Sequence, residues 1–408
     1  MIFLSAQPDS LSFAWQTLVQ NENFKQKGIN PKSIYNLVGY TKVINNRDIW
    51  DKLDSNVIFY EDTRESKSYV SSIRPHIIKK FFKENQHLTK EYCFYYDSDI
   101  IFNELPLFEG MQDGRIHLSD TDVYIGYTYL ETKISEIQND LFNSIGADSK
   151  GVEQIKNTKA GGAQYFFNNL DWTFWDEAET HCENMWKDYH SKLDYYKEKW
   201  LIKKPDEKFD FQIWTVDMWV LFWLMLKRNR QTYINDELSF SWGTWSKNDY
   251  LNHNIFHNAG VTDDSIFFYK GKYINKTPFE EDLKINPNHA QFDYVNLIKE
   301  TGKKFGYKIK NNKTYNFISY VLITDDFDSC FNHYRDLYYK KDNDKELIIY
   351  NIGEPRKIVN QDGIRLINNK TNLSTRQPYE NLEQVKKDIV NFVNGNEIHY
   401  SVVCAMLQ

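Results

Sequence analysis

Apolar side chains recur along the chain with two spacings, one typical of strands and one typical of helices. Short apolar runs of strand length lie at 2–6, 33–40, 56–62 and 91–102. Between the first two, apolar residues from Leu11 to Val19 follow helical spacing after a capping residue, Ser10. Residues 68–85 also predict a helix, with Pro75 near its first turn. This β-α-β order predicts a mostly parallel, buried sheet with helices on both faces.

The same pattern predicts the remaining elements in outline. Strands are expected at 122–130, 160–169, 238–242 and 254–261, a short hairpin at 265–274, and helices at 131–158, 171–198 and 213–228. A boundary near 286–291 precedes a helix that we expect to end at Gly302, since glycine suits a helix C-cap. Beyond it the β-α-β pattern restarts, with strands at 318–324, 346–353 and 398–407 and helices at 325–341 and 382–395.

These boundaries divide the chain into three parts. A length of 408 residues is enough for about two to three domains. We predict a Rossmann-like α/β domain over 1–285, a helix and basic linker over 286–313, and a small C-terminal α/β domain over 314–408.

Composition narrows the class of protein. With 41% hydrophobic residues, 26% charged residues and a mean hydropathy of -0.66, the chain is not an integral membrane protein. A net charge of -7 excludes binding to nucleic acid by overall charge and leaves only a local basic patch. The aromatic share of 16% suits sugars, bases and large cores equally well. Abundant Asn, Lys, Ile and Tyr, which have A+T-rich codons, indicate a phage, giant virus or A+T-rich bacterium as the source.

Cysteines and the N-terminus bear on the compartment. The four cysteines lie far apart and form no CxxC, which argues against structural zinc and a disulfide framework. The first ten residues lack the basic region of a signal peptide. The most apolar stretch, 213–226, is shorter than the ~20 residues of a membrane span and contains Asp217. We therefore expect a cytoplasmic protein, in the host cytoplasm if it is viral.

The first motif that carries chemistry is Asp97-Ser98-Asp99. Two carboxylates two residues apart at the end of a buried strand face the same side. Open α/β sheets bind ligands beyond the carboxyl ends of their strands, and paired carboxylates there suit Mg²⁺ or Mn²⁺ on a diphosphate. A solvated loop is the alternative, but the apolar flanks at 92–96 and 100–102 indicate burial.

Three further features have both a structural and a functional interpretation. Gly161-Gly162 heads a strand, where paired glycines allow close approach of a ligand or simply form a turn or bulge. Asp217 in an apolar helix is capped, paired or functional, or is a first-turn acid that favours the helix dipole. His257, after an apolar strand and before a glycine turn, is a third metal ligand or a structural histidine.

Taken in order, these features resemble the GT-A fold of nucleotide-sugar glycosyltransferases. His257 and Gly260 match the H-x-x-G context of the late metal ligand in that fold. The segments that carry the wider resemblance are SAQPDSLSFAWQ, IRPHIIKKFF, YYDSDIIF, AGGAQYFFNN and VDMWVLFW. They are similar to a group of phage and bacterial proteins assigned as glycosyltransferases, over about residues 1–275.

The resemblance implies a role for each motif residue. The metal, Mn²⁺ or Mg²⁺, would be bound by Asp97, Asp99 and His257. The donor would be a nucleoside-diphosphate sugar, UDP-linked by the resemblance. Its nucleotide would be contacted by Gln7, Asp9 and Arg74, and its sugar would be framed by Gly161, Gly162 and Gln164. Lys270 would lie near the phosphates. Asp217 would lie beside the acceptor hydroxyl. If Asp217 is a general base the configuration inverts, which we favour; otherwise Gln164 lies under the reacting carbon and configuration is retained.

The prediction of the acceptor depends on a basic stretch, residues 299–313. Lys303, Lys304 and Lys308 alternate there with aromatic residues, which is typical of nucleic-acid contacts, although a solvated linker has the same composition. The sequence therefore predicts a hexosyl- or pentosyltransferase whose acceptor is a hydroxymethylated base in phage DNA, flipped out of the helix. The alternatives are a glycan or protein hydroxyl, or a non-catalytic nucleotide-sugar-binding protein.

Overall fold

The computed structural model describes residues 1–262, 266–309, 318–324, 345–351 and 364–368. The chain divides into two compact units, Met1–Ile309 and Lys310–Gln408. The sequence-derived boundaries at 285 and 313 stay a prediction. Among the helices that the structure describes, none combines the length and the apolarity needed to cross a membrane.

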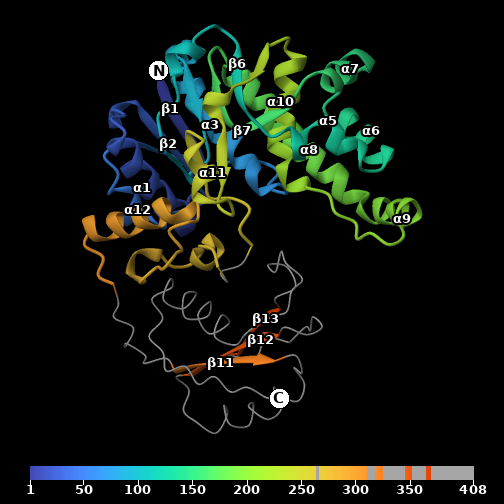
Figure 1. The fold of residues 1–408 in the computed structure, drawn as a ribbon. Helices are drawn as coiled ribbons and strands as arrows, with labels where there is room; N and C mark the ends of the chain where they lie inside the picture. Colours follow the sequence, from blue (N-terminus) through green and yellow to red (C-terminus); the bar gives the residue numbers. More distant parts are fainter. Residues whose placement is uncertain (263–265, 310–317, 325–344, 352–363, 369–408) are drawn as a thin grey trace. The chain divides into compact units, whose positions relative to one another are not determined.

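A seven-stranded sheet forms the centre of the first unit (Figure 1). In sheet order its strands are β3 (Asn56–Glu61), β2 (Ile34–Tyr40), β1 (Ile2–Pro8), β4 (Cys93–Tyr95), β7 (Gly161–Phe167), β6 (Ile116–Asp120) and β8 (Thr232–Ile234). Within this sheet only β7 runs antiparallel to its neighbours. The predicted fold class, α/β with a mostly parallel sheet flanked by helices, is confirmed.

Both faces of this sheet are buried, as the continuous apolar runs predict. Strand β1 shows how: Ile2 and Leu4 join the core cluster that contains Ile77 of α3 (Ile73–Glu84). Phe3 points to the other face and meets Phe24 of α1 (Leu11–Gln26), with the ring centroids 5.9 Å apart. Because the strand is covered on both sides, its residues from Ile2 to Gln7 are all buried, including the polar Ser5 and Gln7.

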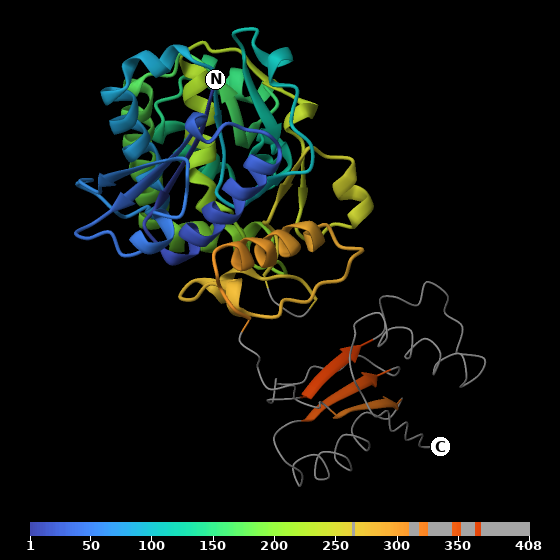
Figure 2. The same ribbon diagram turned by 90° about the vertical axis from the view of Figure 1, so that its left-hand side faces the viewer.

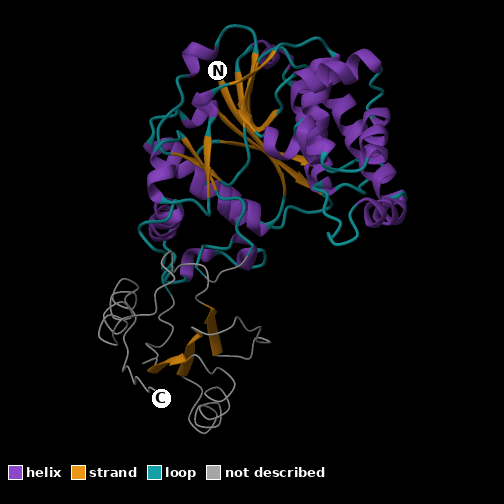
Figure 3. Ribbon diagram, turned by 45° about the vertical axis from the view of Figure 1, so that its right-hand side comes forward, coloured by secondary structure: helices purple, strands orange, loops and turns teal. Residues whose placement is uncertain are grey.

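Helices cover the two faces in separate groups (Figure 3). On one face α3 packs against α8 (Trp172–Ser191), which also contacts α10 (Val216–Lys227). On the other face α1 packs against α12 (Gln291–Lys304), and Figure 2 shows the two helices side by side. The remaining helices of the unit are α2 (Arg47–Trp50), α4 (Asp122–Ile125), α5 (Tyr127–Glu131), α6 (Ser135–Ser144), α7 (Ser149–Asn157), α9 (Leu193–Lys203) and α11 (Lys247–Leu251).

Two predicted helix starts are confirmed in detail. The side chain of Ser10 accepts a hydrogen bond from the backbone nitrogen of Phe13 and caps α1. Pro75 is the third residue of α3, where its missing N–H would have no helical partner in any case. The predicted helix at 171–198 is instead two helices, α8 and α9, which meet at Lys192.

The predicted strand at 91–102 is split between two sheets. Its first part is β4 of the large sheet, and its last part is β5 (Ile100–Phe102) of a small sheet. In that small sheet β10 (Ile255–His257) lies between β5 and β9 (Phe240–Trp242). The turn between β4 and β5 contains Asp97 and Asp99. The two carboxylates therefore lie where the chain passes from the large sheet to the small one.

The predicted strand at 122–130 is wrong, because this segment is helical and forms α4 and α5. The actual strand, β6, ends just before it. Alternating apolar residues suggested a strand, yet Val123 is 81% exposed, so the alternation does not follow burial. Asp122 fixes the helical turn: its carboxylate accepts from the backbone nitrogen of Ala160 and its carbonyl from that of Gly126.

The predicted hairpin at 265–274 is also wrong. Lys270–Tyr273 form a 3₁₀ turn, and residues 263–265 lie outside the described part of the chain. The backbone N–H and C=O of Phe268 both bond to the side-chain amide of Gln291 at 2.7 and 2.8 Å. Those groups are therefore not available to pair across a hairpin.

Helix α12 does not end at the predicted glycine. Gly302 lies inside the helix, where a Cβ atom would come within 3.1 Å of the backbone oxygen of Phe279. The helix ends at Lys304, with Phe305 as its C-cap, and the next residue, Gly306, has φ of 80°. A left-handed residue at this position is the usual end of a helix, so the glycine four residues later performs the predicted role.

The described residues of the second unit form three parallel strands. They are β11 (Ile318–Thr324), β12 (Lys345–Asn351) and β13 (Ile364–Asn368), with β12 in the centre. The expected strand at 318–324 is β11, and the expected strand at 346–353 is β12 up to Asn351, where this stretch of described residues ends; β13 was not predicted. The expected helices at 325–341 and 382–395 and the strand at 398–407 lie outside the described residues.

Candidate functional site

A cleft of about 380 Å³ lies in the first unit, at the end of the sheet where β4 gives way to the Asp97–Asp99 turn. Residues far apart in the sequence line it: the start of α1, the turn after β4, strand β7, the start of α10 and the end of β10. The predicted site residues among its walls are Arg74, Asp97, Asp99, Asp217, His257 and Lys270. This is the place where open α/β sheets bind ligands.

Strand pairing brings the histidine to the two carboxylates. β10 runs antiparallel to β5, and His257 lies opposite Ile100, the residue that follows the Asp97–Asp99 turn. Its Nε2 atom is 3.6 Å from Asp97 Oδ2 and 3.3 Å from Asp99 Oδ1. One ligand atom from each of the three residues lies within 4.8 Å of the others. A cation placed between them would therefore reach all three side chains.

The donor set fits a divalent cation. Two carboxylate oxygens and one imidazole nitrogen suit Mn²⁺, and the oxygens also suit Mg²⁺. Burial raises the pKa of Asp99, but the positive charges of Lys270 and His257 outweigh it and hold this pKa well below its usual range. Asp99 is therefore ionised at neutral pH. Lys270 forms an ion pair with Asp99 Oδ2, so a cationic side chain stands beside the candidate metal ligands.

Arg74 links the candidate metal ligands to the predicted acceptor residue. It is the second residue of α3, and its Nη1 atom lies 3.0 Å from Asp97 Oδ1 and 3.3 Å from Asp217 Oδ2. Burial lowers the pKa of Arg74, but the two carboxylates and the nearby tyrosines raise it well above its ordinary value. The predicted contact of Arg74 with a nucleotide stays a prediction, and in this structure its partners are these two carboxylates.

Asp217 lies in the first turn of α10, as one interpretation expected, and it also lines the cleft. Its functional role stays a prediction. It is buried, and its Oδ1 atom lies 2.8 Å from the hydroxyl of Tyr69. Burial raises the pKa of Asp217, whereas Arg74 and the Tyr69 hydroxyl lower it in part, and the net direction is upward. A carboxyl group whose pKa moves toward neutrality is suited to exchange protons.

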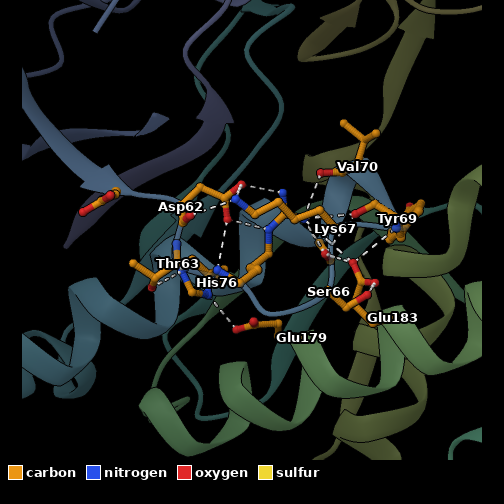
Figure 4. Close-up of polar contacts among 12 residues, drawn as sticks. Asp62, Thr63, Ser66, Lys67, Tyr69, Val70, His76, Glu179 and Glu183 are labelled. Atoms are coloured by element: carbon orange, nitrogen blue, oxygen red, sulfur yellow. Dashed lines mark hydrogen bonds and ion pairs between the residues drawn. The ribbon is translucent and has the colours of Figure 1, made fainter. Parts of the chain in front are cut away.

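A buried ion-pair cluster holds Tyr69 in place (Figure 4). Arg64 forms two parallel hydrogen bonds of 2.9 Å with the carboxylate of Asp62 and donates to Ser72 Oγ at 2.6 Å. Glu183 of α8 accepts from the backbone nitrogen of Tyr69 at 3.2 Å and from Ser72 Oγ at 2.6 Å. These contacts tie the loop that carries Tyr69 to α8.

The glycine-bearing strand β7 contributes two residues to the cleft. Ala163 and Tyr165 line the cavity, whereas Gly161, Gly162 and Gln164 do not. Gln164 accepts a hydrogen bond of 2.6 Å from Ser119 Oγ in the buried interior. The strand bulges at this point, because the register between β6 and β7 shifts and Ala163 has φ of 63°. The roles predicted for these residues at the donor sugar stay predictions.

The two residues predicted at the tip of the first strand also lie outside the cleft walls. The carboxylate of Asp9 accepts bonds of 2.9 Å from Asn46 Nδ2 and Trp50 Nε1 and thereby holds the segment that contains α2. The side-chain amide of Gln7 is buried, and neither of its polar atoms has a hydrogen-bond partner among the described residues. Their contacts with a nucleotide stay predictions.

The aromatic walls of the cleft were not predicted from the sequence. These side chains come from separate elements: Tyr95, Tyr124, Tyr165, Trp214 and Trp242. The high aromatic share of the chain was the signal for them, but it did not say which aromatic residues meet. Ser12 and Gln16, in the first turns of α1, supply polar groups that the sequence analysis also did not single out.

The predicted basic patch lies on α12 and just beyond it. Lys303 and Lys304 are in the last turn of this helix, and both they and Lys308 are exposed. Lys304 forms an ion pair with Glu22, which offsets its charge. None of these three lysines lines the cleft.

Comparisons with known proteins find only distant similarity to solved structures. No protein-family model matches the sequence, and no curated protein matches it. Among solved structures, the galactosyltransferase LgtC with donor and acceptor sugar analogues has 11% identity and a TM-score of 0.35, covering 74% of this chain and 96% of its own. Mouse xyloside xylosyltransferase 1 has 9% identity and a TM-score of 0.32, covering 63% of this chain and 96% of its own.

A third similar structure is the glycosyltransferase GlyE of Streptococcus pneumoniae. It has 9% identity and a TM-score of 0.31, covering 100% of this chain and 80% of its own. All three are glycosyltransferases, the class that the sequence motifs resemble. Because these TM-scores are below 0.5, the functional conclusion rests on the residues of the cleft.

Proposed function

We propose that this protein is a metal-dependent glycosyltransferase. It would move a sugar from a nucleoside-diphosphate sugar, UDP-linked according to the sequence resemblance, to a hydroxyl group of an acceptor. The observation that carries the proposal is the meeting of Asp97, Asp99 and His257 in one cleft, beside Asp217. A purely structural role for so many charged groups at one cleft would leave their convergence unexplained.

The residues of the cleft divide into a donor side and an acceptor side. Mn²⁺ or Mg²⁺ bound by Asp97, Asp99 and His257 would neutralise the charge that develops on the leaving diphosphate. Lys270, which faces Asp99, would contact the phosphates. Arg74 keeps its charge in the buried site and fixes the distance between the metal ligands and Asp217.

On the acceptor side, Asp217 would take the proton of the attacking hydroxyl. Its upward-shifted pKa brings it closer to the working pH, which favours proton transfer to and from a general base. Attack would then come from the face opposite the diphosphate and invert the configuration at the sugar carbon.

The acceptor predicted from the sequence, a hydroxymethylated base in DNA, remains one hypothesis within this proposal. It would require phosphate contacts from Lys303, Lys304 and Lys308. Neutralising all three should flatten the slope of log K against log salt by roughly two to three units, since each phosphate contact contributes about -0.9. An unchanged slope would remove these lysines from the acceptor site.

The test of the proposed function is donor turnover. Purified protein is incubated with a panel of UDP-, GDP- and TDP-sugars, with and without Mn²⁺, and release of the nucleoside diphosphate is measured. We expect release with one donor, loss of release in excess EDTA, and loss in Asp97→Asn and Asp99→Asn. Asp51→Asn is the matched control, because Asp51 is exposed and pairs with Arg47 outside the cleft.

Two outcomes would overturn the proposal. One is full activity of Asp97→Asn or Asp99→Asn in excess chelator. The other is binding of a nucleotide sugar, followed by equilibrium dialysis, without turnover in the presence of any acceptor of the panel; that result would indicate the non-catalytic binding protein.

A further inference from the structure

Two large apolar side chains stand exposed on the rim of the cleft. Trp214 is 61% exposed and Ile274 is 56% exposed, and both line the same cavity as Asp217. Tryptophan is mostly buried in soluble proteins, and an exposed apolar surface at a cleft marks a binding site more often than a scattered surface residue does. Trp214 lies three positions before Asp217, in the 3₁₀ turn Ile213–Thr215 that leads into α10.

The backbone of this tryptophan is held in place by the same group that contacts Asp217. The Tyr69 hydroxyl lies 2.7 Å from the carbonyl oxygen of Trp214 and 2.8 Å from Asp217 Oδ1, and its single proton serves one of them at a time. Glu183 anchors Tyr69 through its backbone nitrogen (Figure 4). The backbone at Trp214 is thus held in place, which limits the conformational entropy that ligand binding would cost there.

The charge of the cleft indicates what kind of ligand would meet Trp214. Among the described lining residues, the carboxylates of Asp97, Asp99 and Asp217 stand against the cations of Arg74 and Lys270, and both cations are paired with those carboxylates. A divalent cation and a donor diphosphate would cancel each other's charge. No positive charge is then left over for an acceptor that carries phosphates, which favours a neutral acceptor.

We propose that Trp214 and Ile274 form the acceptor subsite and bind the apolar face of a saccharide ring. A pyranose has C–H groups on its flat face and hydroxyls at its edge, so stacking on the indole would place an edge hydroxyl toward Asp217. A nucleobase also has a flat apolar face, but in DNA it comes with phosphates, which the charge of this cleft disfavours. This inference rests on the proposed function, because it names the acceptor of that reaction.

The experiment compares variants in binding and in transfer. Trp214→Ala removes the platform, Trp214→Phe keeps a smaller aromatic face, and Trp245→Ala is the matched control, an exposed tryptophan outside the cleft walls. Lactose, maltotriose and chitotriose are the saccharide probes, and a duplex oligonucleotide with 5-hydroxymethylcytosine is the DNA probe. Saccharide binding is followed by quenching of tryptophan fluorescence, and transfer is measured with the donor found in the turnover assay.

We expect one of the saccharides to quench fluorescence and to accept sugar. In Trp214→Ala the acceptor KM should rise about tenfold or more, the effect expected when an aromatic anchor is truncated, while the donor KM changes less. Trp214→Phe should recover part of the loss, and Trp245→Ala should behave as the wild type does.

The following results would overturn the inference. They are an unchanged acceptor KM in Trp214→Ala, an equal rise of donor and acceptor KM, or transfer to the oligonucleotide and to none of the saccharides. If the wild type turns over no donor, the proposed function fails, but the subsite is still decided by fluorescence. If a saccharide quenches the wild-type fluorescence and Trp214→Phe abolishes this quenching, the saccharide subsite at Trp214 is supported. If none of the three saccharides quenches the wild-type fluorescence, the subsite is excluded.

Discussion

Asp217 combines three features that are separately common and together point to chemistry. It lies in the first turn of a very apolar helix, it is buried, and it is bonded to Arg74 and Tyr69. The first-turn position alone would explain an acid there by the helix dipole. The dipole does not explain why the carboxylate faces a cleft beside the candidate metal ligands, whereas a role toward an acceptor hydroxyl does.

Replacing Asp217 by Asn tests this role at the scale of one residue. The change keeps the shape and removes the proton acceptor, so we expect kcat to fall by about 10²–10⁴ with the donor KM little altered. Steady-state kinetics over a series of donor concentrations measures both. A rise in donor KM at unchanged kcat would make Asp217 a binding residue instead.

Loops and strands hold the site through contacts that do not touch the cleft. The Asp62–Arg64 pair is an example at the scale of elements: both side chains are almost fully buried, and the pair fixes the loop that carries Tyr69. Removing one partner of a buried ion pair costs about 3–5 kcal/mol when the other charge is left uncompensated. Here Glu183, whose Oε1 atom lies 3.9 Å from Arg64 Nη1, compensates part of the charge. Asp62→Asn should therefore lower the free energy of unfolding at pH 7 by about 3 kcal/mol, the lower end of that range.

This loss should depend on pH in a defined direction. Burial raises the pKa of Asp62, but Arg64 outweighs it and lowers this pKa to about 2, below the value of ~3.9 in an unfolded chain. A depressed pKa stabilises the fold above the unfolded value, and the stabilisation disappears as the pH falls through the folded value. In urea denaturation, the difference between wild type and Asp62→Asn should thus be constant from pH 7 to about 5 and shrink below about 4.

A matched surface variant separates this pair from ordinary ion pairs. Asp194→Asn breaks an exposed ion pair with Lys197. The Asp194 side chain is 92% exposed. Its effect should stay within about 0.5 kcal/mol at every pH, as expected of surface pairs. If both variants lose the same small amount, the Asp62–Arg64 pair does not anchor the loop.

The packing of β7 on β6 depends on a single small residue at the start of β7. A Cβ atom on Gly161 would lie 2.5 Å from Leu118 Cβ and 2.8 Å from the backbone oxygen of Ser119 on the neighbouring strand. Gly161→Ala should therefore destabilise the protein by about 1–3 kcal/mol, the range for overpacking. Gly110→Ala, where a Cβ atom meets nothing within 4 Å, should change stability by less than about 0.5 kcal/mol.

Denaturation curves of the two glycine variants decide between packing and ligand contact. If Gly161→Ala is as stable as the wild type but loses donor affinity, the glycine serves the ligand, as the sequence resemblance implied. Loss of stability in the absence of ligand would show that it serves the packing of β6 on β7.

At the scale of the whole molecule, all described cleft residues belong to one of the two units. The unit Met1–Ile309 contains the seven-stranded sheet, its covering helices and every described residue of the cleft. A protein ending after Ile309 should therefore fold cooperatively and keep metal-dependent donor turnover within about threefold of the full chain. Thermal unfolding and the donor assay check this, and loss of turnover in a well-folded truncated protein would assign the second unit a part in donor binding.

The sequence alone determined the class of the fold and the first half of the site. Continuous apolar runs separated by helical periods fix a mostly parallel sheet, because only strands buried on both faces omit polar residues. The Asp97-Ser98-Asp99 motif was readable for the same reason, since local sequence places both carboxylates at the end of a buried strand. Ser10 as cap and Pro75 in a first turn were equally local, and the structure confirms both.

Tertiary structure decided what local patterns do not encode. The segment 122–130 has the residues of a strand but is helical, because Asp122 bonds to a distant backbone nitrogen, that of Ala160. The meeting of His257 with the two aspartates depends on the pairing of β10 with β5, between residues more than 150 positions apart. Trp214 became a candidate for acceptor binding only through its exposure on the rim, which follows from how the chain packs and not from the residue type.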